Sequence, residues 1–322
     1  MCKISTNEKY MRRCLQLASC GRENAKPNPM VGAVIVHDGR IIGEGYHVRC
    51  GEGHAEVNAF ASVKPCDEKF LKDSTMYVSL EPCSHYGKTP PCCELIISKG
   101  VRHVVVGCVD PFAKVSGRGI QRMRDAGIEV EVGVLENECL ELNRKFITFN
   151  TEHRPYIILK WCTTANGFLD DKCKTAMLSN DFTKMLSHKL RAENDAILVG
   201  RVTAERDCCK LNVRDWYGKD PMRLVLDANN PCFESLDFNA PVLPQLMSEL
   251  YDRKIQSLIV EGGAVTHNKF IEAGLWDEIR IETSCKCVSG GTPAPQLPAN
   301  VKMTEQKTYG DNIIRRFRKI KQ

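Results

Sequence analysis

The sequence predicts a protein of two successive α/β domains. The chain has 322 residues, more than the roughly 100–200 residues of one ordinary domain. In each half, short apolar runs alternate with amphipathic stretches, which is typical of strands alternating with helices. Between the halves, the polar segment 151–155 ends in a proline, and a new apolar run begins at Tyr156. We therefore expect one domain over residues 1–150 and a second over residues 151–322.

The first half begins with a helix and a hairpin. Ser5 and Glu8 have the spacing of a capping box, and apolar residues at helical spacing follow them. Asp38-Gly39 suits the tight turn between two strands at 30–36 and 41–47. Further helices are expected over residues 54–61, 90–99, 119–126 and 136–149, and strands over 75–80, 101–108 and 129–132. This order of elements predicts a three-layer domain.

The second half repeats the alternation of strands and helices without an internal sequence repeat. It starts with a strand over residues 156–161. Further strands are expected over residues 196–199, 223–226, 257–260, 278–282 and 313–317, and helices over 181–193, 245–253 and 264–273. Strands separated by helices predict a largely parallel sheet.

Composition and charge exclude several classes of protein. The chain is 43% hydrophobic and 26% charged, which is typical of a folded globular protein. It contains neither an apolar run of roughly 18 residues nor an apolar leader, so we expect a cytoplasmic protein with no membrane partner. The net charge of +5 is low for a nucleic-acid-binding protein. The 17 cysteines are odd in number, which favours reduced thiols, some of them binding metal, over a disulfide framework.

A set of His, Glu and Cys residues in the first half predicts a metal site. His54-Ala55-Glu56 is followed by Glu81-Pro82-Cys83 and then by Cys92-Cys93. Imidazole and thiolate are ligands that zinc prefers, and three protein ligands leave the fourth position to water, as in catalytic zinc sites. Glu56 is then placed to carry a proton from that water to a leaving amine. Two alternatives are a structural zinc site, with Cys93 or His85 as fourth ligand, and a set of unrelated buried cysteines.

These residues resemble the cytidine-deaminase superfamily, whose signature is H-x-E followed by P-C-x-x-C. The sequence departs from that spacing, because eight residues separate Cys83 from Cys92. The insert is similar to the deaminase domain of the bifunctional riboflavin-biosynthesis deaminases/reductases. Other segments that carry this resemblance are Pro27–Gly32, Gly45–His47, Glu81–His85 and Asp110–Gly119.

The resemblance implies the ligands and the substrate of this domain. It selects His54, Cys83 and Cys92 as zinc ligands and Glu56 as the catalytic residue. The implied substrate is a diaminopyrimidinone that carries a ribose 5-phosphate, and the implied contacts are Asn28, His47, His85 and Lys88. Asn can read a base edge as both donor and acceptor, and Lys can meet a phosphate as a point charge.

In the second half, the residues alone indicate one candidate anion-binding loop. Val260-Glu261-Gly262-Gly263-Ala264 joins an expected strand to an expected helix, where backbone amides can approach an anion. The alternative is a tight strand-to-helix turn, since the loop lacks the spacing of a dinucleotide fingerprint.

The resemblance to the same family continues through the second half and implies a reductase with a dihydrofolate-reductase-like fold. It rests on segments that include Lys160–Gly167, Asp195–Gly200, Pro221–Asp227 and Gly274–Glu278. The implied NADPH contacts are Thr163, Met177, Thr203, Asp207 and Gly263. The implied substrate contacts are Thr175, Arg191, Leu211, Arg214 and Glu261. Arginine forks suit a substrate phosphate.

Three departures from the family pattern concern the reductase. Asn166 stands where the family often has Asp, and Ala228 where a Ser often contacts the cofactor. Only 32 residues separate Asp227 from Val260, about half the usual connection, so at least one strand and one helix beside the NADPH cleft should be missing.

The resemblance thus predicts an α/β protein with an N-terminal three-layer cytidine-deaminase-like domain and a C-terminal dihydrofolate-reductase-like domain that has a shortened segment. It predicts two activities in riboflavin biosynthesis, with Zn²⁺ and NADPH as cofactors and phosphoribosylated pyrimidines as substrates. We also expect a homo-oligomer and no nucleic-acid partner. The alternatives are a deaminase whose reductase half is only a scaffold, a zinc deaminase acting on nucleic acid, and a purely structural zinc protein.

Overall fold

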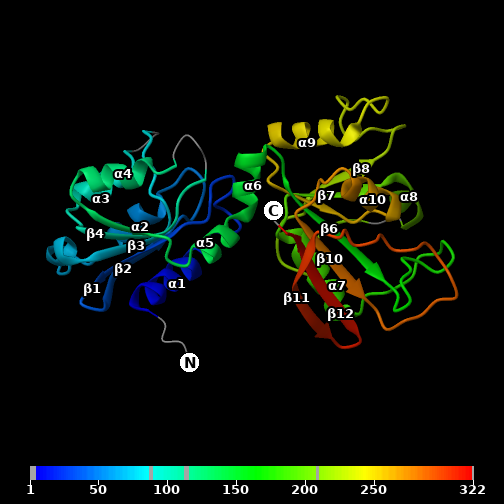
Figure 1. Ribbon diagram of the computed structural model, residues 1–322, viewed down its shortest axis with the longest axis horizontal. Coiled ribbons are helices and arrows are strands. Elements are labelled where there is room, and N and C mark those ends of the chain that lie inside the picture. The colour runs from blue at the N-terminus through cyan, green and yellow to red at the C-terminus, as the bar shows by residue number, and fades with distance from the viewer. Residues whose placement is uncertain (1–4, 87–89, 112–115, 208–209, 321–322) are drawn as a thin grey trace. The chain divides into compact units, whose positions relative to one another are not determined.

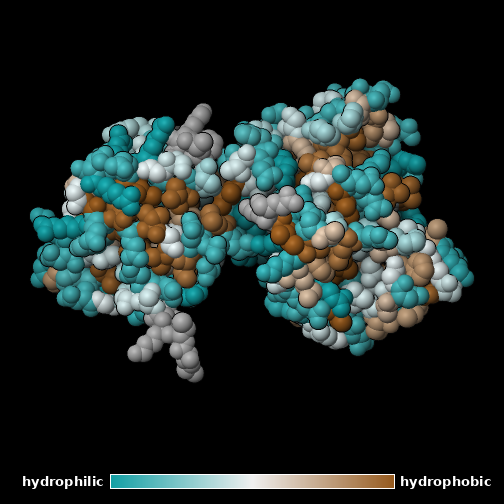
Figure 2. Space-filling model, viewed as in Figure 1, coloured by the Kyte–Doolittle hydropathy of each residue, from teal (hydrophilic) through white to brown (hydrophobic). Residues whose placement is uncertain are grey.

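The computed structural model describes residues 5–86, 90–111, 116–207 and 210–320. The chain divides into two compact units, Met1–Thr151 and Glu152–Gln322, and each has its own sheet (Figure 1). Within the described residues, no helix combines the length and the apolar character needed to cross a lipid bilayer. Hydrophilic residues cover most of the face of each unit that Figure 2 shows, and hydrophobic residues show through in patches.

The first unit is built on a five-stranded sheet in the order β2-β1-β3-β4-β5. The strands are β1 (Gly32–His37), β2 (Arg40–Tyr46), β3 (Thr75–Leu80), β4 (His103–Cys108) and β5 (Glu129–Val132). The hairpin partner β2 and the strand β3 both run antiparallel to β1, whereas β3, β4 and β5 are mutually parallel.

Helices cover both faces of this sheet. They are α1 (Thr6–Ser19), α2 (Ala55–Ala61), α3 (Cys92–Ser98), α4 (Arg118–Asp125), α5 (Glu136–Leu142) and α6 (Arg144–Glu152), and a short 3₁₀ helix spans Glu68–Asp73. One core packs α2, α3 and α4 against Ile35 and Val104, while the other packs α1 and α5 against Val34 and Val105. Adjacent residues of one strand thus face opposite cores, as the strand pleat requires, and the predicted three-layer fold is confirmed.

Local sequence signals explain several boundaries in the first unit. The Ser5 hydroxyl accepts a hydrogen bond from the Glu8 amide at 3.2 Å, which starts α1 as the capping-box spacing predicted. Asp38 and Gly39 have positive φ angles of 46° and 75°, as a type I′ turn requires. The single helix predicted over residues 136–149 is wrong, because α5 and α6 are separated at Asn143, which uses its buried side chain to bond both backbone groups of Met30.

The second unit is built on a seven-stranded sheet in the order β11-β12-β10-β6-β9-β7-β8. The strands are β6 (Tyr156–Thr163), β7 (Ala196–Gly200), β8 (Met222–Leu226), β9 (Ser257–Val260), β10 (Glu278–Thr283), β11 (Val301–Tyr309) and β12 (Asn312–Lys319). The five from β10 to β8 are parallel, and β12 and β11 add an antiparallel edge.

Helices again cover both faces. They are α7 (Asp181–Ala192), α8 (Arg201–Asp207), α9 (Val242–Asp252) and α10 (Ala264–Glu272). Leu246 of α9 and Phe270 of α10 pack on the face that carries Leu159, whereas Leu190 of α7 packs on the opposite face. The sequence analysis did not predict β11 or α8. Between β8 and α9 the described chain forms neither helix nor strand, so the sheet ends at β8.

Candidate active sites

Three candidate metal ligands converge in the first unit. His54 precedes α2, Cys83 follows β3, and Cys92 is the first residue of α3. One ligand atom from each lies within 4.8 Å of the other two. The His54 Nδ1 atom is 3.6 Å from the Cys83 Sγ atom and 3.3 Å from the Cys92 Sγ atom. This donor set, one imidazole and two thiols, is the chemistry that fits a zinc ion.

The electrostatics around the two thiols favour a thiolate at Cys83. Its sulfur accepts the backbone N–H of Cys92 at 3.3 Å. The hydrogen bond with the Cys92 thiol, joined by that of His54, lowers the pKa of Cys83, while the same shared hydrogen bond raises the pKa of Cys92. A thiolate is the form of cysteine that binds metal. Cys93 instead lies fully buried in the apolar core and is not part of the cluster.

Glu56 lies beside this cluster on the first turn of α2. Its side chain is buried, with a residue exposure of 3%. Burial raises the pKa of Glu56 to about 7. A carboxyl group with such a pKa can hold or release a proton near neutral pH, which is the property a proton carrier needs.

Glu81 fixes the segment that carries Cys83. Its buried carboxylate accepts hydrogen bonds from the backbone amides of Asp110, Gly117, Gly119 and Ile120, at 3.2, 2.9, 2.9 and 3.4 Å. The amides of Gly117, Gly119 and Ile120 lie at the start of α4, whose N-terminus favours a negative charge. A Cβ atom at Gly119 would lie 2.1 Å from the Pro82 carbonyl oxygen, so only glycine permits this approach. The metal-ligand segment and the start of α4 are thereby joined.

The expected contacts of the deaminase substrate are only partly brought together. Asn28 Nδ2 lies 3.2 Å from His47 Nε2, and His47 Nδ1 lies 3.1 Å from the Gly53 carbonyl oxygen. The His47 and His54 rings meet edge-to-face with centroids 5.4 Å apart, so Asn28 and His47 adjoin the metal ligands. His85 is exposed and makes no side-chain hydrogen bond or ion pair with the described residues. Lys88 lies outside the described residues.

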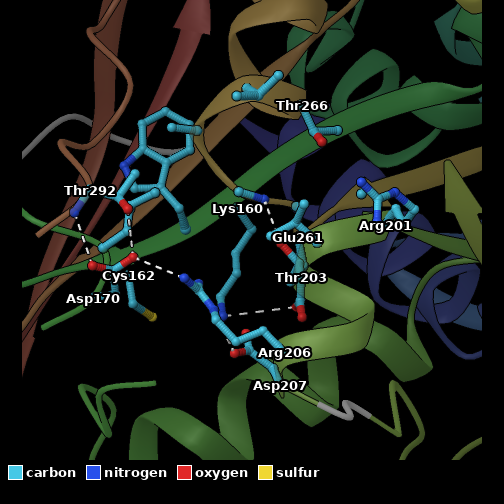
Figure 3. A pocket seen from close by; sticks show the side chains of 18 of the residues that line it. Lys160, Cys162, Asp170, Arg201, Thr203, Arg206, Asp207, Glu261, Thr266 and Thr292 are labelled. Carbon is cyan, nitrogen blue, oxygen red and sulfur yellow. Dashed lines mark hydrogen bonds and ion pairs between the residues drawn. The ribbon is translucent and has the colours of Figure 1, made fainter. Parts of the chain in front are cut away.

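A cleft of about 840 Å³ opens in the second unit at the carboxyl ends of its parallel strands (Figure 3). Seven of the ten residues expected to contact NADPH or substrate line it: Met177, Thr203, Asp207, Gly263, Arg191, Arg214 and Glu261. Thr175 is bonded to one of them, because its hydroxyl donates to Asp207 Oδ1 at 2.8 Å. Thr163 and Leu211 are buried and do not line the cleft.

An acidic residue and two basic residues meet inside this cleft. Arg191 donates to Glu261 at 2.6 Å, and the ammonium nitrogen of Lys160 lies 3.9 Å from the same carboxylate. Burial works to raise the pKa of Glu261, but the charges of Lys160 and Arg191 outweigh it, so this pKa lies below its ordinary value. The cleft therefore presents a carboxylate and two cations beside each other, a set able to bind polar and phosphorylated groups.

The loop after β9 has the features of an anion-binding turn. Gly263 precedes α10, and its amide donates to the Thr203 hydroxyl of α8 at 3.1 Å. A Cβ atom at Gly262 would lie 2.8 Å from the Thr266 Cβ atom, which explains glycine there. The start of α10 can hold a phosphate of a dinucleotide, so the residues present fit NADPH.

The short connection after β8 still contributes to the cleft. Ala228 and Phe238 from this connection, together with Val242 at the start of α9, line its side. The sequence analysis expected a strand and a helix to be missing beside the cleft. On that side, the described connection supplies apolar side chains instead.

Two features of the cleft escaped the sequence analysis. The sequence analysis assigned no role to Lys160, although a lysine within the apolar strand β6 is a signal of function. Asp170, Arg206 and Thr292 also line the cleft. They come from segments whose proximity no sequence pattern indicated.

Comparisons with known proteins agree with this architecture. The family profile "Cytidine and deoxycytidylate deaminase zinc-binding region" matches residues 4–108, and the RibD C-terminal domain matches residues 155–314. Riboflavin biosynthesis protein RibD of Aquifex aeolicus is 36% identical over 88% of each chain. The RibD protein of Escherichia coli is 36% identical over 96% of each chain.

A solved structure is similar over almost the whole chain. It is a diaminohydroxyphosphoribosylaminopyrimidine deaminase/5-amino-6-(5-phosphoribosylamino)uracil reductase from Thermotoga maritima, with a TM-score of 0.87 and 33% identity. The match covers 98% of this chain and 99% of that chain.

Fold, sites and matches together define an enzyme that joins a deaminase domain of the zinc-binding type to a reductase domain. The predicted fold class and the predicted resemblance are confirmed. The chain belongs to the RibD family, and it is a bifunctional deaminase and reductase of riboflavin biosynthesis.

Proposed function

We propose that the first unit holds one Zn²⁺ through His54, Cys83 and Cys92 and deaminates 2,5-diamino-6-(5-phosphoribosylamino)pyrimidin-4(3H)-one. The second unit then reduces the ribosyl group of 5-amino-6-(5-phosphoribosylamino)uracil to ribityl with NADPH. The observation that carries the proposal is the convergence of the three ligand atoms within 4.8 Å, next to the buried carboxyl group of Glu56. The substrates are those in the name of the Thermotoga maritima protein.

In the deaminase unit, Glu56 moves the proton. Bound zinc would activate a water molecule for attack on the ring carbon that bears the amine. Glu56 takes a proton at its carboxylate and delivers it to the amine, which leaves as ammonia. Asn28 and His47 hold the pyrimidine: with the His47 proton on Nδ1, that ring donates to Gly53 and accepts from Asn28. We assign His85 and Lys88 to the remaining substrate contacts.

In the reductase unit, the chain positions two ligands. NADPH supplies the reducing equivalents when bound. Thr203 and Gly263 hold its phosphates at the start of α10, and we assign Met177 and Asp207 to the rest of the cofactor. Arg191, Arg214 and Glu261 orient the phosphoribosyl substrate, with Thr175 as a further contact. Lys160, held by Glu261, can donate a proton to the ribosyl oxygen.

The test measures both reactions on purified protein. Ammonia release from the diaminopyrimidinone and NADPH oxidation with the deaminated intermediate are followed separately. We expect both, with weak NADPH affinity because the connection after β8 is short. A protein that deaminates but oxidises no NADPH at millimolar cofactor would be a deaminase with a scaffold half. A protein that does neither would contradict the whole proposal. The net charge of +5 gives no support for nucleic acid as the substrate.

A further inference from the structure

Asp170 is a buried carboxylate in the wall of the cleft, and none of the roles above uses it. The residue is 1% exposed. Its Oδ1 atom accepts the backbone amides of Cys173 and Thr292 at 3.0 and 2.9 Å. Its Oδ2 atom accepts the Thr292 hydroxyl at 2.6 Å and the Arg206 guanidinium at 3.2 Å. Figure 3 shows Asp170 between Thr292 and Arg206 at the side of the cleft.

These bonds join three segments that are distant in sequence. Asp170 belongs to the loop after β6, Thr292 to the loop after β10, and Arg206 to the last turn of α8. The two loops are also paired through their backbones, as the Leu169 amide donates to the Thr292 carbonyl oxygen at 2.8 Å. A Cβ atom at Gly291 would lie 2.2 Å from the Asp170 carbonyl oxygen, so the loops meet with no room for a side chain.

The same bonds extend to residues assigned to ligands. Arg206 also pairs with Asp207 at 3.3 Å, and Asp207 accepts the hydroxyl of Thr175 at 2.8 Å. Arg206 thus lies between two carboxylates, which offset its charge. Arg206 is thereby bonded within the wall of the cleft. Burial works to raise the pKa of Asp170, but its bonds to Thr292 and Cys173 and the charge of Arg206 outweigh that effect, so the carboxylate is ionised at neutral pH.

We propose that Asp170 is a positioning residue for NADPH, acting through Arg206 and Thr292 to hold the loop after β6, the loop after β10 and α8 as one wall of the cleft. The role rests on the proposed reductase function. Without the carboxylate, Arg206 loses one of its two acidic partners, and the two loops lose the side chain that bonds across them. The wall then has to be ordered when cofactor binds, which weakens binding. Lys160, the proposed proton donor, and Glu261, which orients the substrate, are not bonded to Asp170, so turnover at saturating cofactor should change little.

The experiment compares Asp170→Asn with Asp171→Asn in the full chain. Asp171 is the exposed neighbour, and its side chain makes no hydrogen bond or ion pair with the described residues. NADPH binding is titrated by protein fluorescence, and KM and kcat are measured with the deaminated intermediate. We expect Asp170→Asn to raise Kd and KM for NADPH roughly tenfold with kcat nearly kept, and Asp171→Asn to match the parent. In a double-mutant cycle, Asp170→Asn should raise the Kd for NADPH by a smaller factor in an Arg206→Gln background than in the parent.

Several outcomes separate this role from the function it depends on. If the parent binds NADPH and Asp170→Asn binds it within about twofold, the positioning role is wrong and the reductase function stands. The positioning role would also be wrong if the effects of the two substitutions on the Kd for NADPH were purely additive, or if Asp170→Asn lowered kcat alone. If the parent binds no NADPH, the cofactor assignment and this role fall together. Should Asp170→Asn unfold the second unit, Thr292→Val decides: it removes one bond and should weaken NADPH binding a few-fold, and an unchanged Kd would refute the role.

Discussion

His54, Cys83 and Cys92 come from three separate places in the sequence. Their pattern indicated a metal site, but it left Cys92 and Cys93 both open as the third ligand, and only the family resemblance selected Cys92. Each stands at the end of a strand or the start of a helix, where sequence signals are strongest. Asp170 had no such signal, because its partners Thr292 and Arg206 become neighbours only through loop packing. Motif spacing therefore indicated the chemistry of the first unit, but it could not predict side-chain bonds between distant loops, such as those of Asp170.

Replacing Cys83 should remove the metal, whereas replacing its near neighbour Cys93 should not. Cys83→Ser loses a thiolate ligand, and its affinity for Zn²⁺ should fall by more than about tenfold. Cys93→Ser changes a residue of the apolar core and should lower stability with one zinc per chain retained. Metal analysis of the dialysed proteins checks both. Zinc loss from Cys93→Ser, with retention in Cys83→Ser, would reverse the assignment.

Glu56→Gln should separate metal binding from turnover. The amide keeps the shape of the side chain and does not disturb the three ligands, so one zinc per chain should remain. It cannot take up a proton, so the deamination rate should fall by about 10²–10⁴-fold. Ammonia release and metal content are measured on the same sample. Deamination at the parent rate would show that another group carries the proton.

At the scale of elements, apolar runs and caps predicted most helices and strands, and tertiary contacts decided the rest. The helix expected over residues 136–149 divides into α5 and α6 because Asn143 bonds Met30, which is distant in sequence. Strand β11 has mostly exposed residues, so its sequence lacks the apolar alternation that marks a half-buried strand. The break between α5 and α6 and the formation of β11 both depend on contacts with residues outside the segment, which a local sequence pattern does not contain.

The start of α4 should depend on the charge of Glu81. Glu81→Gln keeps one acceptor oxygen but directs an N–H₂ group at backbone amides that need an acceptor. The free energy of unfolding of the first unit should fall by about 1–3 kcal/mol. Glu94→Gln is the matched control, because Glu94 makes a partly exposed ion pair with Arg122 at 3.2 Å and should cost only about 0–1 kcal/mol. Denaturant unfolding of both variants gives the comparison, and equal costs would contradict the account of Glu81.

At the scale of the whole molecule, each unit has its own sheet, core and site. The order of elements in each half was predictable from sequence, since alternating strands and helices follow each other along the chain. The cleft of the second unit was only partly predictable. Its lining includes Ala228 and Phe238, which lie in the connection between β8 and α9, where the sequence shows no pattern of a strand or a helix.

Metal removal should therefore affect one activity and spare the other. Treatment with a chelator should reduce ammonia release by at least about 100-fold, because the proposed reaction uses a water molecule that bound zinc would activate. NADPH oxidation with added deaminated intermediate should stay within about twofold, since no metal-ligand cluster was found among the described residues of the second unit. Restored deamination after adding Zn²⁺ excludes damage by the chelator. Parallel loss of both activities would contradict the independence of the two sites.

The end of the sheet at β8 has a consequence for how the chain behaves during synthesis. An outermost strand leaves a row of unpaired backbone groups, which can recruit strands of other nascent chains. Here that strand has only five residues, and Arg223 near its start is exposed and charged. Brevity and charge are both features by which natural sheets discourage such recruitment. The sheet can thus end at β8 without presenting a long, uncharged edge to other chains.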